Sequence, residues 1–181
     1  GSAGSQYLRH ESANNREFLS WDTPGSQGDG VLVARFNSSA VVELDMEVFL
    51  CWDPDTGGDH GSHYGINVTQ STTYLKRWDA GSDTILDTNS LSLDAGDDYY
   101  IKFERAGSAV RARVWKASGV EPGTWDVTDS DATYSSGQIG IAMKSASSNV
   151  LILRDISFST DSTDVNTTAG AVVVAGFNAD V

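Results

Sequence analysis

Short apolar runs separated by turn residues form the main pattern along this chain of 181 residues. The runs are too short and too regularly interrupted by Gly, Asp and Ser to be helices, so strands follow strands, which favours an antiparallel arrangement over βαβ units. The pattern therefore predicts an all-β, antiparallel jelly-roll β-sandwich. Two acidic turns, 79–83 and 94–98, are predicted to close hairpins. The predicted strands are 31–37, 40–51, 63–69, 73–79, 83–87, 98–105, 109–116, 138–144 and 149–158.

The clearest hairpin in the pattern joins residues 98–105 to residues 109–116. Pairing Arg105 with Val110 places the apolar side chains of both strands on one face, and the polar and remaining aromatic ones on the other. A shift by one residue would mix the two faces, so the hydrophobic pattern predicts this register. On the polar face, the register pairs Glu104 with Arg111, Lys102 with Arg113 and Tyr100 with Trp115.

The segment 42–48 alternates apolar and acidic residues with a period of two. Side chains of a strand point alternately to its two faces. The segment is therefore predicted to be half-buried, with a solvated acidic outer face. Its apolar face consists of Val42, Leu44, Met46 and Val48, and its acidic face consists of Glu43, Asp45 and Glu47.

The charge balance of the chain excludes several partners. Twelve Lys and Arg residues stand against 25 Asp and Glu residues, which leaves a net charge of -13. Nucleic acids and anionic membrane surfaces both require a basic surface, so neither is an expected partner. No apolar run approaches the roughly 20 residues of a spanning helix, so membrane insertion is not expected. The single cysteine, Cys51, excludes an internal disulfide and is predicted to be a buried small hydrophobic residue.

The composition also divides the chain into segments. Residues 1–5 have the sequence of a cloning remnant, and residues 6–159 are predicted to form the jelly-roll β-sandwich. Residues 160–168 are polar and are predicted to be a linker. Residues 169–181 contain another apolar run, which is expected to be an extra strand or the start of a following domain.

The stretch from Asp98 to Ser159 carries a succession of motifs. It resembles the C-terminal half of a concanavalin A-like lectin/glucanase (laminin G-like) jelly-roll module. Such modules are appended to secreted carbohydrate-active proteins and to tail or fibre proteins of bacterial viruses (phage). The resemblance is a pattern of strands, so it implies a fold more than a reaction. The motifs are Tyr99-Tyr100-Ile101-Lys102-Phe103-Glu104-Arg105, Val110-Arg111-Ala112-Arg113-Val114-Trp115-Lys116, Glu121-Pro122-x-x-Trp125, Gly137-Gln138-Ile139-Gly140-Ile141 and Leu153-Arg154-Asp155-Ile156-Ser157-Phe158.

The resemblance implies a non-catalytic module for adhesion to a glycan or a cell-surface polysaccharide. Its expected location is extracellular, on a cell surface or on a virion. An exposed Trp or Tyr can stack on the apolar face of a sugar ring, while neighbouring polar groups bond the hydroxyls. The candidate ligand-binding residues are Trp52, His63, Tyr64, Tyr100, Arg113 and Trp115.

The loop after Trp52 is rich in carboxylates and glycine. Asp53, Asp55 and Asp59 offer the oxygen ligands that Ca²⁺ prefers. The spacing is not that of an EF-hand, because Gly57 stands where a ligand belongs. Jelly-roll lectins often carry structural calcium in such loops, so the resemblance implies a Ca²⁺ cofactor here. A polar turn without a metal is the alternative interpretation.

Two further functions stay open. One is a structural or assembly spacer of a larger surface or phage protein, in which residues 169–181 pair with a neighbouring domain or subunit. The other is a small glycoside hydrolase, because the spacing of Glu43, Asp45 and Glu47 resembles the catalytic strand of laminarinase-type and lichenase-type enzymes. A retaining carboxyl pair lies about 5–5.5 Å apart, whereas i and i+4 backbone positions on a strand lie about 13 Å apart. A non-enzymatic role is therefore expected.

Overall fold

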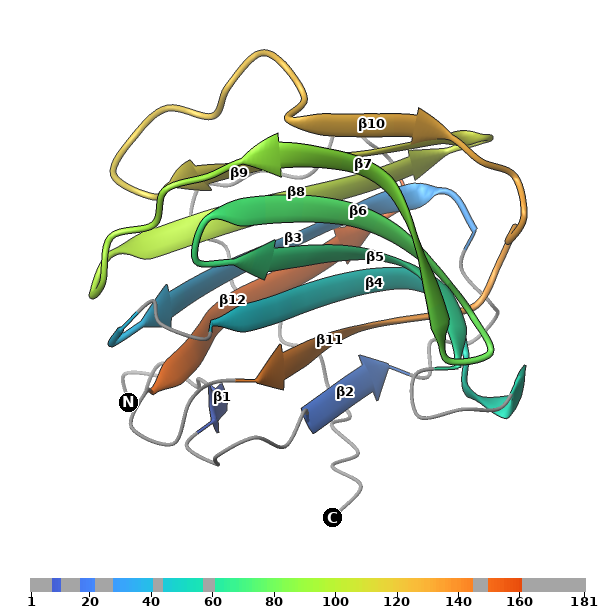
Figure 1. The fold of residues 1–181 in the computed structure, drawn as a ribbon, viewed down its shortest axis with the longest axis horizontal. Coiled ribbons are helices and arrows are strands. Elements are labelled where there is room, and N and C mark those ends of the chain that lie inside the picture. The colour runs from blue at the N-terminus through green and yellow to red at the C-terminus, as the bar shows by residue number, and fades with distance from the viewer. Residues whose placement is uncertain are drawn as a thin grey trace, which may run out of the picture.

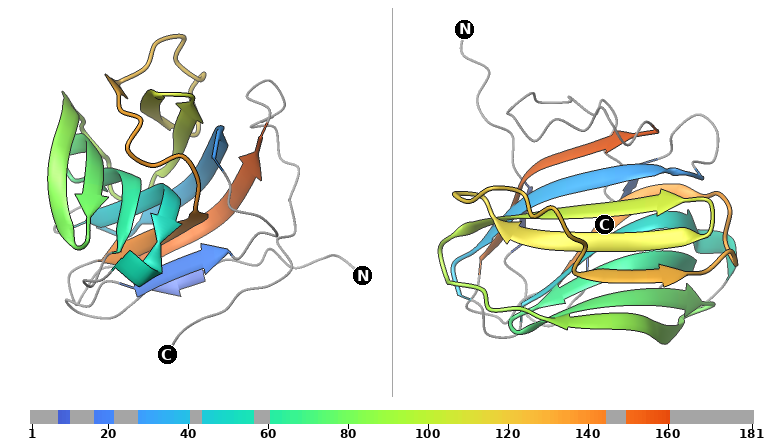
Figure 2. Two further views of the ribbon diagram at one scale, coloured as in Figure 1. Left: turned by 90° about the vertical axis from the view of Figure 1, so that its right-hand side faces the viewer. Right: turned by 90° about the horizontal axis from the view of Figure 1, so that it is seen from above.

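The structure, a computed structural model, describes residues 8–10, 17–21, 28–40, 44–56, 61–144 and 150–160. In this part of the chain, two antiparallel sheets of six strands pack face to face (Figures 1 and 2). The first sheet contains β1 (Leu8–His10), β3 (Gly30–Ser38), β8 (Asp98–Ala106), β9 (Ala109–Lys116), β10 (Val127–Ser130) and β12 (Leu151–Ser159). The second contains β2 (Glu17–Trp21), β4 (Asp45–Asp53), β5 (Ser62–Thr69), β6 (Thr72–Asp79), β7 (Ser82–Ser90) and β11 (Gln138–Lys144).

The strand order is that of a jelly roll. The first sheet runs β1-β12-β3-β8-β9-β10, and the second runs β2-β11-β4-β5-β6-β7. Strands β4 to β7 form a meander, whereas β3 and β12 pair although they lie at opposite ends of the sequence. The predicted all-β sandwich is confirmed. A short 3-10 helix, η1 (Pro54–Thr56), follows β4, and the described residues hold no helix that could cross a membrane.

The hydrophobic core lies between the two sheets and takes one side of each long strand. Its largest members include Phe36 on β3, Ile66 on β5, Phe103 on β8 and Ile141 on β11, all of them almost completely buried. Each such side chain contributes roughly 1.5–3 kcal/mol by leaving water. The core is therefore supplied by the alternation visible in the sequence. On β5, for example, the inward residues are Tyr64, Ile66 and Val68.

The predicted hairpin has the predicted register. Arg105 lies opposite Val110, and Tyr100 lies opposite Trp115. The turn at 79–83 also closes a hairpin, with Ala80 and Gly81 in left-handed conformations. The turn at 94–98 does not, because it leads from β7 in the second sheet to β8 in the first. That prediction was wrong because turn residues mark a reversal of direction but not which sheet the next strand joins.

Three strands escaped prediction. Strand β10 has four residues, of which Val127 alone is apolar, so no alternation marks it. Strands β1 and β2 are also short, and each pairs at an edge of its sheet. Residues 41–43, in the first half of the predicted strand 40–51, lie outside the described residues. The predicted linker at 160–168 and the run at 169–181 also lie outside them, except for Thr160.

Candidate functional site on the outer face of the second sheet

A β-bulge in β4 turns Trp52 to the outer face of the second sheet. Leu50 points into the core, and Cys51 has a φ of 61°, a left-handed conformation that is rare outside glycine. The pairing of β4 shifts here against both of its neighbours. Cys51 therefore also joins the core, and Trp52 emerges on the other side. Gly137 permits this path, since a Cβ there would lie 2.3 Å from the carbonyl carbon of Cys51.

Trp52 begins a row of rings that crosses three adjacent strands. Its indole meets Phe49 edge-on, with ring centroids 5.4 Å apart. The Phe49 ring lies 5.2 Å from His63, and the His63 ring stacks 5.8 Å from Trp78, both measured between centroids. Phe49 and His63 are buried, while Trp52 and Trp78 each keep part of their surface exposed. We call these four residues, together with Glu47, the aromatic face.

Glu47 lies beneath this row and corrects the prediction of a solvated acidic strand. Its side chain is completely buried. Oε1 lies 3.1 Å from Nε2 of His63 and accepts a hydrogen bond of 3.0 Å from the indole Nε1–H of Trp78. The carboxylate reaches both partners across Gly65, where a Cβ would lie 2.0 Å from Oε1. A glycine on the neighbouring strand and two polar partners thus accommodate a buried carboxyl group that alternation alone assigns to solvent.

Polar groups surround the exposed end of the row. The ammonium group of Lys76 lies 5.4 Å from the ring centroid of Tyr74 and 5.5 Å from that of Trp78. It also donates to Asp83 of β7 over 2.8 Å. This hydrogen bond lowers the pKa of Asp83, so the carboxylate stays ionised. Beyond it, Ile85 exposes 53% of its surface on the edge strand.

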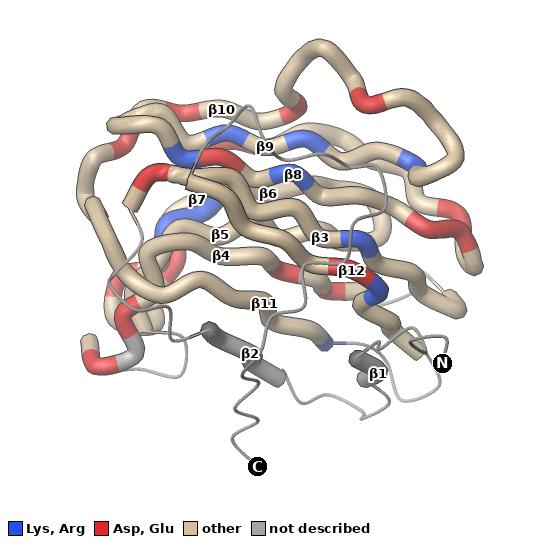
Figure 3. Tube along the Cα trace, turned by 180° about the vertical axis from the view of Figure 1, so that it is seen from behind, with Lys and Arg blue, Asp and Glu red and all other residues tan. Residues whose placement is uncertain are grey.

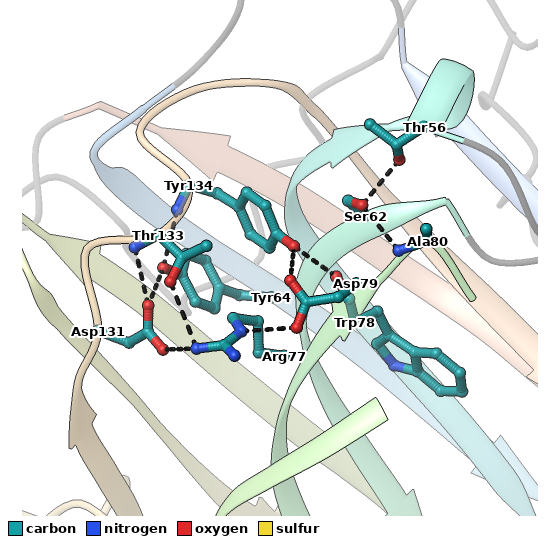
Figure 4. A network of polar contacts seen from close by, with 10 residues as sticks. All are labelled: Thr56, Ser62, Tyr64, Arg77, Trp78, Asp79, Ala80, Asp131, Thr133 and Tyr134. Carbon is teal, nitrogen blue, oxygen red and sulfur yellow. Dashed lines mark hydrogen bonds and ion pairs between the residues drawn. The ribbon is translucent and has the colours of Figure 1, made fainter. Parts of the chain in front are cut away.

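A polar network holds β5 and β6 from the core side (Figure 4). His63 and Trp78 are cross-strand partners on the outer face, and the next pair, Tyr64 and Arg77, points inward. The Tyr64 hydroxyl donates to Asp131 over 2.7 Å, and Arg77 donates to the other oxygen of the same carboxylate over 2.6 Å. The network joins the β10–β11 loop to the strands that carry His63 and Trp78. Further bonds link Arg77 to Asp79, and Tyr134 to Asp79 and to the carbonyl oxygen of Trp78.

Tyr64 therefore belongs to the core and not to the surface. Its side chain is buried, its hydroxyl accepts from the backbone N–H of Tyr134, and burial raises its pKa to about 12. Burial alone would raise the pKa of Asp131. Hydrogen bonds from Thr133, Tyr64 and Arg77 outweigh that effect and lower it far below its usual range. Tyr64, predicted to bind ligand, is thus a core residue that ties the β10–β11 loop to β5.

Three other candidate ligand residues lie on the opposite side of the molecule. Tyr100 and Trp115 stack at 5.3 Å on the outer face of the first sheet, and Trp115 exposes only 8% of its surface. The loop 117–126 is tied to this face, because Glu121 accepts from Lys102 over 2.9 Å and from Arg113. Lys and Arg residues gather on β3, β8, β9 and β12 (Figure 3). We call this outer surface of β3, β8 and β9 the ladder face.

The predicted calcium ligands are described only in part. Asp53 and Asp55 are exposed, and Asp53 Oδ1 accepts the backbone N–H of Asp55 over 3.0 Å at the start of η1. Asp59 lies outside the described residues. Among the residues that are described, no three His, Cys, Asp or Glu side chains form a group that could hold a metal ion. What is visible of Asp53 is an Asx turn, so the described residues do not by themselves fit a calcium site.

The proposed catalytic pair is likewise described in part. Glu43 lies outside the described residues, so its separation from Glu47 is not tested. Glu47 is buried between a histidine and an indole N–H. Cys51 is buried, as predicted, and burial raises the pKa of its thiol to about 11, which disfavours the reactive thiolate.

Two residues of the aromatic face, and the glycine beside Glu47, were missed when the sequence alone was considered. Phe49 stands in an apolar run, Trp78 stands among charged residues, and Gly65 carries no side chain at all. One signal was available. On β5 the residues between the apolar positions are His63, Gly65 and Asn67, which contain no formal charge and so suit a covered outer face.

The chain matches no known family profile and no curated protein by sequence. Its fold is nevertheless shared by many solved structures. The carbohydrate-binding module CBM66 from Bacillus subtilis has a TM-score of 0.66 at 12% identity, covering 86% of this chain and 92% of that one. The exoplasmic/lumenal domain of VIP36, solved with Ca²⁺ and mannose, has a TM-score of 0.64 at 10% identity, covering 99% and 86%. A xylan β-1,4-xylosidase from Bacillus halodurans C-125 has a TM-score of 0.61 at 10% identity, covering 84% of this chain and 32% of the enzyme. The fold is thus that of the concanavalin A-like lectins.

Proposed function

We propose that this domain is a non-catalytic module that binds carbohydrate, on a polysaccharide or a cell surface. The observation that carries the proposal is the aromatic face. Partly exposed Trp52 and Trp78 stand at the two ends of one row of rings, with Lys76 and Asp83 beside it. Sugar rings offer an apolar face for stacking and hydroxyls for charged and polar groups. The names of the solved structures with the same fold support the same class of ligand.

The aromatic face is a better candidate than the ladder face for this role. On the ladder face, Trp115 is buried, and Arg113 is bonded to Glu121 and to the carbonyl oxygen of Pro122. A sugar would have to displace these contacts before it met the Trp115 ring. On the aromatic face, a bulge with a strained residue directs Trp52 outward, and strain of this kind clusters at functional sites.

A glycan array with the purified domain tests the proposal. We expect selective, saturable binding that is lost in Trp52→Ala and retained in Tyr100→Ala, a ladder-face variant. Binding lost in Tyr100→Ala but not in Trp52→Ala would move the site to the ladder face. An array without hits for the wild type would contradict carbohydrate binding altogether.

The same array, run with Ca²⁺ and with a chelator, tests the calcium hypothesis. Asp53, Asp55 and Asp59 remain its proposed ligands, and loss of binding in chelator would support it. Binding that is equal in both conditions would contradict a calcium requirement. An extracellular, cell-surface or virion location remains part of the proposal, in keeping with a fold that also occurs in an exoplasmic/lumenal domain.

A further inference from the structure

The buried carboxylate of Glu47 has a geometry that a packing residue does not need. It comes from β4, and its two partners come from β5 and β6, so one side chain links three adjacent strands. Both partners meet the same oxygen, Oε1, at 3.1 Å from His63 Nε2 and 3.0 Å from Trp78 Nε1. On β5, which lies between β4 and β6, Gly65 lacks the Cβ that would collide with this oxygen.

The chemistry of the three groups determines where the protons lie. An indole Nε1–H can only donate, and an ionised carboxylate can only accept. When Glu47 is ionised, its bond with His63 therefore requires a proton on Nε2. The stacking of His63 on Trp78, with an interplanar angle of 22°, then places both rings roughly parallel beside the carboxylate. The hydrogen bond to Glu47 and the stack on His63 both restrain the orientation of the Trp78 ring.

We infer that Glu47 is a positioning residue for the proposed glycan site. It holds the plane of the Trp78 ring and the tautomer of His63 without touching the sugar. The inference rests on the proposed function, because the orientation of Trp78 matters for binding only if a ligand stacks on the aromatic face. An aromatic ring that is free to rotate binds a sugar more weakly, because the ligand must then fix the ring at a cost in conformational entropy.

The experiment combines an assignment of the indole N–H resonances with titrations of defined sugars. The Trp78 Nε1–H signal is identified in a ¹H–¹⁵N spectrum by its disappearance in Trp78→Phe. The titrated sugars are mannotriose and xylotetraose. Their affinities are measured by isothermal titration calorimetry at a temperature well below unfolding. The variants are Glu47→Gln and Glu47→Ala, with Glu104→Gln as matched control. Glu104 is also buried on an outer face, where it accepts from Arg111.

We expect the Trp78 indole signal to move and to exchange faster with solvent in both Glu47 variants. Affinity should fall at least about tenfold in Glu47→Ala, which corresponds to one lost hydrogen bond to a charged group. Glu47→Gln keeps one acceptor oxygen and should recover part of the affinity. Glu104→Gln should lower stability while leaving both the signal and the affinity unchanged.

Three outcomes would overturn the inference. An unmoved indole signal would mean that Glu47 does not orient Trp78. A moved signal with affinity within twofold of wild type would mean that the orientation is irrelevant to binding. A wild type that binds neither these sugars nor any array glycan would refute the proposed function and with it the link to affinity, while the indole signal would still decide whether Glu47 orients the ring.

Discussion

The two outer faces of the sandwich use similar residues in opposite ways. On the ladder face, charged side chains pair with one another above the sheet, as in Lys102 and Arg113 with Glu121. Trp115, on the same face, is buried. On the aromatic face, the carboxyl group of Glu47 is buried, and parts of Trp52 and Trp78 reach solvent. The comparison shows that the exposure of an aromatic residue depends on what packs over it more than on which face its strand register assigns.

The distribution of cations sharpens the contrast. Seven of the twelve Lys and Arg residues lie on β3, β8, β9 and β12, all in the first sheet. Most of them bond carboxylates nearby, as Arg35 does with Asp98 and Arg111 with Glu104. These ion pairs serve to hold the first sheet and its loops in place. The seven residues are Arg35, Lys102, Arg105, Arg111, Arg113, Lys116 and Arg154.

The largest expected difference separates Trp115 from Trp52. Trp115→Ala should lower the free energy of unfolding by about 3–5 kcal/mol, because it empties a buried site. Trp52→Ala should lower the free energy of unfolding by about 1 kcal/mol, because the Trp52 ring is partly exposed. Of the two variants, only Trp52→Ala should abolish glycan binding. Urea unfolding and the glycan array measure the two effects. Equal losses of stability would contradict the contrast between the faces.

A pair of glycines gives the next test. Gly65→Ala should lower the free energy of unfolding by about 1–3 kcal/mol, because the new Cβ would push Glu47 away from both of its partners. Gly123→Ala, in the loop of the ladder face, is the control, because nothing lies within 4 Å of its added Cβ. Denaturant melts of the two variants compare them directly. An unchanged free energy of unfolding in Gly65→Ala would show that the Glu47 side chain can adopt another position without loss of stability.

Glu121→Gln should have a smaller effect, about 1–2 kcal/mol. It leaves two largely buried cations, Lys102 and Arg113, without their shared carboxylate, a case between an exposed and a buried ion pair. Limited proteolysis should then cut the loop 117–126 faster than in wild type. Asp155→Asn removes a mostly exposed carboxylate and should leave cleavage unchanged. Unchanged cleavage in Glu121→Gln would show that other contacts hold the loop.

The smallest expected effect is a change in the acid limb of stability. Burial would raise the pKa of Asp98, but hydrogen bonds from Arg154 and Arg35 outweigh it and lower the pKa below 3.8. A carboxylate with a depressed pKa stabilises the fold above its unfolded pKa, and this contribution is lost as pH falls through the folded one. Below about pH 4, the free energy of unfolding of Asp98→Asn should therefore fall less steeply with pH than that of the wild type. The difference should be less than about 1 kcal/mol, because the ion pairs of Asp98 with Arg35 and Arg154 are partly exposed. Parallel melts of the variant and wild type across this range would refute the assignment.

Features that depend on local alternation could be derived from the chain alone. The register of β8 and β9 followed from Ile101 and Phe103 facing Val114 and Ala112, because any other pairing would expose apolar side chains. The two-residue difference between the predicted and observed ends of β4 has a local cause, because the strand continues past the bulge at Cys51.

The site required contacts between strands distant in the sequence. Glu47 alternates like a solvated residue, and its burial depends on Gly65, His63 and Trp78, which lie up to 31 positions away. Similarly, the pairing of Trp115 with Tyr100 was visible from the register, but the burial of Trp115 was not.

The amino-acid sequence was thus sufficient for nine of the described strands, for the register of the β8–β9 hairpin and for the class of fold, because apolar periodicity is a property of neighbouring residues and the hydrophobic effect acts on it directly. Only the tertiary structure decided which side chains on the two outer faces are covered. That depends on a left-handed residue at Cys51, on the space above Gly65 and on a loop held by Glu121, each of which acts between strands that meet only when the sandwich is closed.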